Sequence, residues 1–145
     1  MYVFITGCDL FSSDPLGDFT SPNYPDDYPD NAQCTYIIDV PGATIINVEF
    51  NDFDLELYND YLYYGKGSIP NVESQGAFTG YDLPDPVQIP GQAMWFIFVS
   101  DASSHFRGFS LTWRISGECF CPRIINDFFS SFKHINVWIL KMVNC

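Results

Sequence analysis

The run Met94-Trp-Phe-Ile-Phe-Val-Ser-Asp-Ala-Ser103 is the most informative stretch of the chain. Residues 94–99 are apolar at every position, so both faces of a strand formed here would be buried, as in the central strand of a sheet. The polar segment Ser100-Asp-Ala-Ser103 follows directly, where such a strand would end. The stretch therefore predicts a buried strand that places a carboxylate, Asp101, at one end of a β-structure.

Shorter runs on both sides alternate apolar and polar residues with the period of a strand. Three clear cases are residues 35–40, 46–50 and 109–113, and weaker candidates are residues 18–20, 61–64, 76–79 and 87–89. Segments rich in Pro, Gly and Asn separate these runs, and no window of 12 residues in the first 113 shows a clean helical period. The pattern predicts an all-β fold, an antiparallel jelly-roll β-sandwich.

The composition indicates a folded acidic domain. The 145 residues carry 18 acidic and 6 basic side chains, for a net charge of −12, and 47% of the residues are hydrophobic. A disordered acidic chain would lack this apolar content, and the length suits one core. The negative charge argues against nucleic acids and anionic membrane surfaces as partners, because both would repel it. Cations and basic proteins are the natural complements.

The charge changes sign near residue 114. Residues 1–113 carry a net charge of −14, whereas residues 114–145 carry +2. We therefore expect the domain to end at about residue 115 and residues 116–145 to form a separate C-terminal tail of unknown structure. The apolar stretch 135–143 in this tail is too short to cross a bilayer, which needs about 20 residues. A membrane-spanning segment is not supported.

Five cysteines, an odd number, leave at least one without a partner inside the chain. Cys8 and Cys34 would enclose a loop of about 25 residues, and a disulfide there would contribute roughly 3–4 kcal/mol. The alternative is two unrelated buried thiols. The pairing of the others, Cys119, Cys121 and Cys145, is not predicted. Residues 1–7 are apolar but lack the basic region and the longer apolar region of a signal peptide.

Carboxylates follow two of the predicted strands. Glu56 ends the segment Asp52-Phe-Asp-Leu-Glu56, Asp60 comes four residues later, and Asp101 follows the central strand. If these segment ends converge, the three carboxylates would repel one another and raise one another's pKa values. A hard divalent cation such as Ca²⁺, which binds six to eight oxygens, would resolve the conflict. The alternative is that these acids are solvated loop charges.

Zinc fits this set of residues poorly. The chain has only two histidines, His105 and His134, and no close group of His and Cys residues. Zinc sites are built mainly from these two residue types. The sequence therefore favours an oxygen-binding cation over zinc.

The chain resembles a CUB domain from Cys8 to Trp113, in the order and the number of its motifs. The matching segments include Phe19-Thr-Ser-Pro-Asn-Tyr-Pro25, Asn31-Ala-Gln-Cys34, Phe50-Asn-Asp-Phe-Asp-Leu-Glu56, Asp60-Tyr-Leu62, Gly76-Ala-Phe-Thr-Gly80 and Gly108-Phe-Ser-Leu-Thr-Trp113. The second and third of these are similar to CUB modules of nematode secreted proteins, some of which also carry C-type lectin domains. The resemblance implies a secreted jelly-roll sandwich over residues 8–115, with Cys8 and Cys34 joined.

The calcium-binding subset of that family has its metal at one end of the sandwich. By motif, the resemblance implies that Glu56, Asp60 and Asp101 supply carboxylates and Ser103 a backbone carbonyl. Tyr28 would hydrogen-bond and orient an acidic ligand. Such sites commonly capture a Lys or Arg side chain of a protein partner. The resemblance thus implies a non-catalytic, calcium-stabilised interaction module of the extracellular space.

Three features depart from the family pattern. The chain has no cysteine between residues 35 and 118, so the second disulfide of the family is missing. The segment from Glu56 to Asp60 is shorter than in the complement-protease relatives, and the tail after about residue 115 matches no part of the family. These departures leave the geometry of the loop between Glu56 and Asp60 open.

Two other functions remain as alternatives. The sequence has no Gly-x-Ser-x-Gly elbow, no HExxH motif and no glycine-rich phosphate loop, so we predict that the chain is not an enzyme. Glu56 with Asp101 is the one carboxylate pair that a glycosidase could use, but a sandwich this small leaves little room for a sugar cleft. The second alternative is a carbohydrate-associated role in innate defence beside a lectin domain, which rests on analogy.

Overall fold

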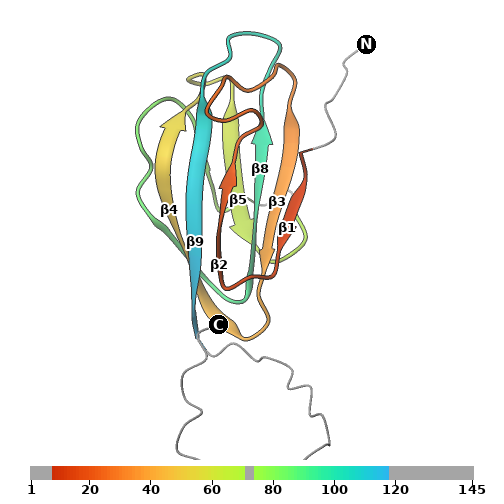
Figure 1. Cartoon of the computed structure of the whole chain (residues 1–145), viewed down its shortest axis with the longest axis vertical. Coiled ribbons are helices and arrows are strands. Elements are labelled where there is room, and N and C mark those ends of the chain that lie inside the picture. The colour runs from red at the N-terminus through yellow and green to blue at the C-terminus, as the bar shows by residue number, and fades with distance from the viewer. Residues whose placement is uncertain (1–7, 71–73, 118–145) are drawn as a thin grey trace, which may run out of the picture.

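The computed structural model describes residues 8–70 and 74–117, which form two facing β-sheets (Figure 1). In spatial order, the first sheet holds β1 (Leu10–Ser12), β3 (Gln33–Asp39), β8 (Ala93–Val99), β5 (Tyr61–Lys66) and β6 (Gly76–Phe78). The second sheet holds β2 (Leu16–Thr20), β9 (Gly108–Gly117), β4 (Ala43–Asp54) and β7 (Val87–Pro90). Among these strands, β1 pairs in parallel with β3, and the other pairings are antiparallel. The predicted all-β sandwich is confirmed.

Strand β8 is the central strand of the first sheet, as its apolar sequence predicts. Met94, Phe96 and Phe98 are fully buried between the sheets. Trp95, on the other face, is also buried, and its ring lies across Gly65 of β5, where a Cβ atom would be 2.3 Å from the ring. The glycine therefore allows the close approach that buries this outer face.

Several strand boundaries differ from the prediction, and one strand was not predicted. Strand β4 runs from Ala43 to Asp54 and β9 from Gly108 to Gly117, both longer than the alternating runs. Strand β1 was missed because Leu10 and Phe11 are largely exposed and do not alternate with polar residues. Residues 118–145, with most of the predicted tail and its three cysteines, lie outside the described residues, as do residues 1–7.

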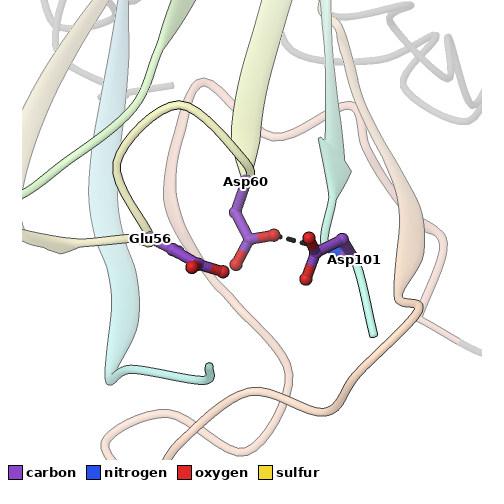
Figure 2. Close-up of side chains that lie close together, drawn as sticks. All are labelled: Glu56, Asp60 and Asp101. Carbon is purple, nitrogen blue, oxygen red and sulfur yellow. Dashed lines mark hydrogen bonds between the residues drawn. The ribbon is translucent and has the colours of Figure 1, made fainter. Parts of the chain in front are cut away.

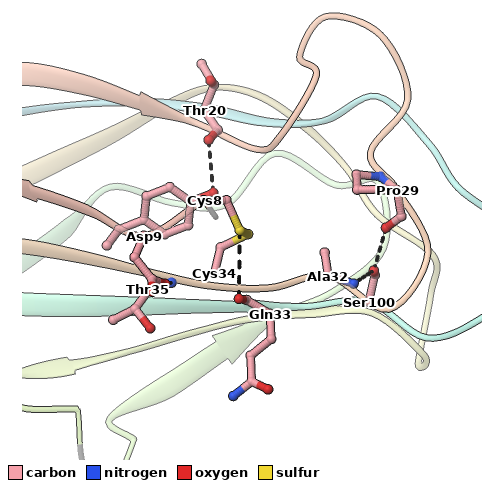
Figure 3. Close-up of a disulfide and its surroundings, with 10 residues drawn as sticks. Cys8, Asp9, Thr20, Pro29, Ala32, Gln33, Cys34, Thr35 and Ser100 are labelled. Atoms are coloured by element: carbon pink, nitrogen blue, oxygen red, sulfur yellow. Dashed lines mark hydrogen bonds between the residues drawn. A yellow bond between two sulfur atoms is a disulfide. The ribbon is translucent and has the colours of Figure 1, made fainter. Parts of the chain in front are cut away.

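A disulfide between Cys8 and Cys34 joins the segment before β1 to the start of β3 (Figure 3). The two Cα atoms are 5.1 Å apart, and Cys34 is fully buried. The Asp9 carboxylate accepts a hydrogen bond of 2.7 Å from the backbone N–H of Thr35. The disulfide implied by the resemblance is confirmed, and together with this bond it fixes β1 beside β3.

The loops that follow β2, β4 and β8 gather at one end of the sandwich, opposite the end where β9 finishes (Figure 1). We call this the acidic end, and it comprises residues 21–32, 55–60 and 100–107. Backbone hydrogen bonds from Tyr28 to Phe106 and from Asn31 to Asp101 join two of the loops. In the part of the chain that the structure describes, no helix is long and apolar enough to cross a membrane.

Candidate metal centre at the acidic end

Glu56, Asp60 and Asp101 meet at the acidic end (Figure 2). One carboxylate oxygen from each residue lies within 4.8 Å of the others. Glu56 follows β4, Asp60 directly precedes β5, and Asp101 follows β8. Asp60 is fully buried, Glu56 is half-buried and Asp101 is exposed, so the cluster has an inner side and a solvent side.

The segment from Glu56 to Asp60 is a tight turn with its carboxylates at the two ends. The backbone N–H of Asp60 donates to the carbonyl of Glu56 over 3.1 Å, which closes the turn. The Thr79 hydroxyl donates to the same carbonyl over 3.1 Å and accepts from the N–H of Tyr58 over 2.9 Å. The short spacing between Glu56 and Asp60 is thus compatible with convergence of their carboxylates.

Tyr28 holds the buried side of the cluster. Its hydroxyl donates to Asp60 Oδ2 over 2.5 Å and accepts from the backbone N–H of Glu56 over 3.0 Å. The other Asp60 oxygen accepts from the backbone N–H of Asp101 over 2.8 Å. Because Tyr28 is itself buried, these bonds fix Asp60 and the start of the Glu56 turn in one geometry.

The electrostatics of the cluster favour a cation. Burial raises the pKa of Asp60, and the charges of Asp101 and Glu56 raise it further, while the hydrogen bonds from Tyr28 and from the Asp101 backbone partly oppose the rise. Glu56 Oε2 is buried and accepts no hydrogen bond from the residues that the structure describes. A buried carboxylate oxygen without a partner beside two further carboxylates fits a hard cation such as Ca²⁺.

The basic side chains of the acidic end pair with other carboxylates. Arg107, the one basic residue close to the cluster in sequence, lies 3.2 Å from Asp52 and 3.6 Å from Asp54. His105 lies 3.2 Å from Asp30. These pairs leave the charge of the three-carboxylate cluster without a cationic partner among the described side chains.

Ser103 lies beside Asp101. Its backbone N–H and its hydroxyl both donate to Asp101 Oδ1, over 2.8 and 3.0 Å. These bonds orient the exposed carboxylate through one of its two oxygens. The role of the Ser103 carbonyl as a metal ligand stays a prediction.

Sequence reasoning missed Thr79. Its motif, Gly76-Ala-Phe-Thr-Gly80, carries no chemistry of its own, and Thr79 is more than 20 residues from Glu56 and Tyr58. Only the pairing of β5 with β6 brings the hydroxyl to the turn. A hydrogen bond over such a separation leaves no signal in a single sequence.

Comparisons with known proteins agree with this fold. The family model described as CUB domain matches residues 8–113. Bone morphogenetic protein 1 of Xenopus laevis is 37% identical over 111 residues, which cover 73% of this chain and 16% of that protein. Cubilin of Homo sapiens is 36% identical over 113 residues, which cover 74% of this chain and 3% of that protein. The chain therefore spans only a small part of these relatives.

A solved structure has a similar fold. The crystal structure of the MASP-1 CUB2 domain bound to Ca²⁺ is 32% identical, with a TM-score of 0.65, and the match covers 73% of this chain and 96% of that one. The family match extends from the first disulfide cysteine into β9, the last described strand. The chain belongs to the CUB domain family, whose members are non-catalytic modules of extracellular proteins.

Proposed function

We propose that this domain is an extracellular interaction module that binds Ca²⁺ through Glu56, Asp60 and Asp101 and then captures a Lys or Arg side chain of a protein partner. The observation that carries the proposal is the convergence of three carboxylates, one of which has a buried oxygen without a hydrogen-bond partner among the described residues. The calcium-bound CUB2 domain of MASP-1, a structural neighbour, supports the choice of metal.

The three carboxylates would have different tasks. Asp60 is buried and uses both oxygens in hydrogen bonds to the other loops, so it would anchor the ion to the body of the domain. Bound Ca²⁺ would supply the positive charge that allows the three carboxylates to stay ionised together. Asp101 is exposed and oriented by Ser103, so it would present an oxygen to the ammonium or guanidinium group of the partner.

The test is a nuclear magnetic resonance titration of the full chain with Nα-acetyl-lysine amide, in millimolar calcium and in chelator. We expect saturable shifts of amide signals in residues 55–60 and 100–104 in calcium only. Asp101→Asn should abolish the response, whereas Asp18→Asn, an exposed position on β2, removes the same charge and should retain it. Equal responses with and without calcium, or a normal response of Asp101→Asn, would contradict the proposal.

No observation on the described residues favours the carbohydrate alternative over this one. It stays a prediction by analogy.

A further inference from the structure

The turn of the candidate metal centre and the loop bonded to it carry exposed apolar side chains. Leu57 is 44% exposed, and Tyr58 and Tyr81 are each 73% exposed. We call Leu57, Tyr58 and Tyr81 the apolar shelf. Single exposed apolar residues are common on protein surfaces, but three residues on two joined loops next to a carboxylate cluster form a local surface of distinct chemistry.

The shelf is close to the carboxylates because of the turn that carries it. Tyr58 is the middle residue of the turn from Glu56 to Asp60, so its Cα lies within about 7 Å of the Cα of each acidic residue. Leu57 packs on Gly80, where a Cβ atom would lie 2.7 Å from Leu57 Cδ1. The backbone N–H of Leu55 donates to the Gly80 carbonyl over 2.9 Å, which places the residue before Tyr81 beside the start of this turn.

Tyr58 has an unusual backbone. Its φ angle is 67°, in the left-handed region that glycine and asparagine adopt most easily. Its ring is mostly exposed, so burial of the side chain does little to offset the backbone cost. The Thr79 hydroxyl bonds its N–H over 2.9 Å, and its carbonyl accepts from the Tyr61 hydroxyl over 3.2 Å. The fold therefore keeps an exposed aromatic side chain at a position where glycine would have less backbone strain. This arrangement indicates that the ring has a function of its own.

The neighbouring charges indicate what binds there. The carboxylates select a cation, and the shelf beside them offers apolar contact to whatever is attached to that cation. An anionic membrane surface is disfavoured, because residues 1–113 carry a net charge of −14. A protein segment that combines a basic residue with an apolar one meets both requirements.

Building on the proposed function, we propose that the apolar shelf binds an apolar side chain next to the captured Lys or Arg. The domain would then select protein segments in which a basic and an apolar residue are adjacent. The carboxylates fix the basic side chain, and Tyr58 covers its apolar neighbour. Selectivity for the apolar neighbour would come from Leu57, Tyr58 and Tyr81, and affinity for calcium would not.

The test compares two capped peptides, Gly-Gly-Lys-Phe-Gly-Gly and Gly-Gly-Lys-Gly-Gly-Gly, titrated into the full chain in millimolar calcium. We expect the Lys-Phe peptide to bind about fivefold tighter, as partial burial of one aromatic side chain would give. Tyr58→Gly should remove this preference while leaving the calcium affinity and the Lys-Gly affinity within about twofold. Its melting temperature should be unchanged or higher, because glycine adopts the same φ without strain.

Two further variants test whether the preference comes from the Tyr58 ring, from the backbone at this position or from non-specific apolar contact. Tyr58→Asn, which also tolerates a left-handed backbone, should lose the preference as Tyr58→Gly does. Leu16→Ser removes an apolar side chain of 64% exposure on β2 and should keep the preference. Loss of the preference in Leu16→Ser would show non-specific contact and overturn the proposal.

The outcomes also distinguish this proposal from the one on which it rests. If the Lys-Gly peptide binds in calcium but the Lys-Phe peptide binds no tighter, the shelf proposal is wrong and the calcium module stands. If neither peptide binds in calcium, both proposals are wrong. Calcium-dependent binding to phosphatidylserine vesicles that requires Tyr58 would assign the shelf to a membrane and also overturn the proposal.

Discussion

The two ends of the sandwich differ in the residue types that adopt a left-handed backbone where the chain reverses direction. At the end away from the carboxylates, every described residue with a left-handed backbone is a glycine. The acidic end and its adjoining loops have two such glycines and also every non-glycine residue of this kind in the described ranges. The glycines of the opposite end are Gly42, Gly67, Gly91 and Gly117, and the non-glycine residues of the acidic end are Asn23, Asn31, Tyr58 and Ser104.

This difference shows where the sequence accepts the free-energy cost of a left-handed backbone. Glycine gives a left-handed backbone without steric penalty, whereas other residues cost roughly 1 kcal/mol or more. The acidic end offsets the cost with hydrogen bonds between loops, through side chains such as Tyr28, Thr79 and Ser100. The described loops of the opposite end join strands, whereas those of the acidic end also hold side chains in a defined geometry.

The largest expected effect concerns the disulfide, which stabilises the domain as a whole. Replacing Cys8 and Cys34 with serine should lower the free energy of unfolding by about 3.5 kcal/mol, because the disulfide closes a loop with a sequence separation of 26. Urea unfolding of the wild type and the double variant measures the loss. Labelling of both thiols in the native, unreduced wild type would contradict it.

A smaller effect separates the two ends directly. Thr79→Val removes two hydrogen bonds from the Glu56 turn, and it should lower stability by about 1–2 kcal/mol and calcium affinity about five- to tenfold. Thr44→Val, at the opposite end, removes a hydrogen bond of 2.9 Å to the Ser116 carbonyl. It should lower stability without changing calcium affinity. Thr79→Ser should restore the calcium affinity.

Calorimetric titration with calcium and urea unfolding of all three variants provide the two readouts. If Thr79→Val and Thr44→Val reduce calcium affinity equally, the hydroxyl at position 79 has only a structural role.

Backbone substitutions at the two ends should have opposite signs. Gly42→Ala places a side chain on a residue with a φ of 90° and should destabilise the domain by about 1–2 kcal/mol. Ser104→Gly relieves a φ of 54° at the acidic end and should leave stability equal or raise it by up to about 1 kcal/mol. Thermal unfolding measures both, and a similar loss in the two variants would remove the contrast between the ends.

The smallest effect is expected from pH, since the hydrogen bonds to Asp60 partly offset its burial. Burial raises the pKa of Asp60 in the folded state, so the folded domain holds this proton at a pH where the unfolded chain has lost it. The resulting stability is full in acid and is lost as pH rises from about 4 through the folded pKa.

In chelator, stability should therefore fall over this range more in the wild type than in Asp60→Asn. Calcium needs the ionised carboxylate, so the stabilisation by calcium should grow over the same range. Thermal unfolding between pH 4 and 7 measures how stability in chelator and stabilisation by calcium each change with pH. Identical slopes for wild type and Asp60→Asn in chelator would contradict the assignment of the effect to Asp60.

Much of the fold could be predicted because the alternation of apolar and polar residues is a local property of the sequence. The central strand β8 and the alternating parts of β3, β4 and β9 follow directly from the pattern of apolar residues. The short strand β1 could not, because Leu10 and Phe11 are exposed and its partner strand β3 lies about 26 residues further along the chain. Local pattern fails where a distant contact decides the structure.

The convergence of the three carboxylates was predictable to a similar degree. Strand ends and the family resemblance indicate Glu56, Asp60 and Asp101, and their convergence agrees. The partners of Arg107 and the hydroxyl of Thr79 were not predictable, because hydrogen bonds and ion pairs across 20 to 55 residues depend on the register of β5, β6 and β9.

The central claim is that three carboxylates at one end of the sandwich share one cation. Calorimetric titration of the full chain with calcium tests it most directly, beside Glu56→Gln, which removes the charge of the carboxylate with the unpartnered oxygen. The account predicts one bound Ca²⁺ per wild-type chain, with at least tenfold weaker binding in the variant. Absence of saturable binding at millimolar calcium, or equal affinity in Glu56→Gln, would contradict it.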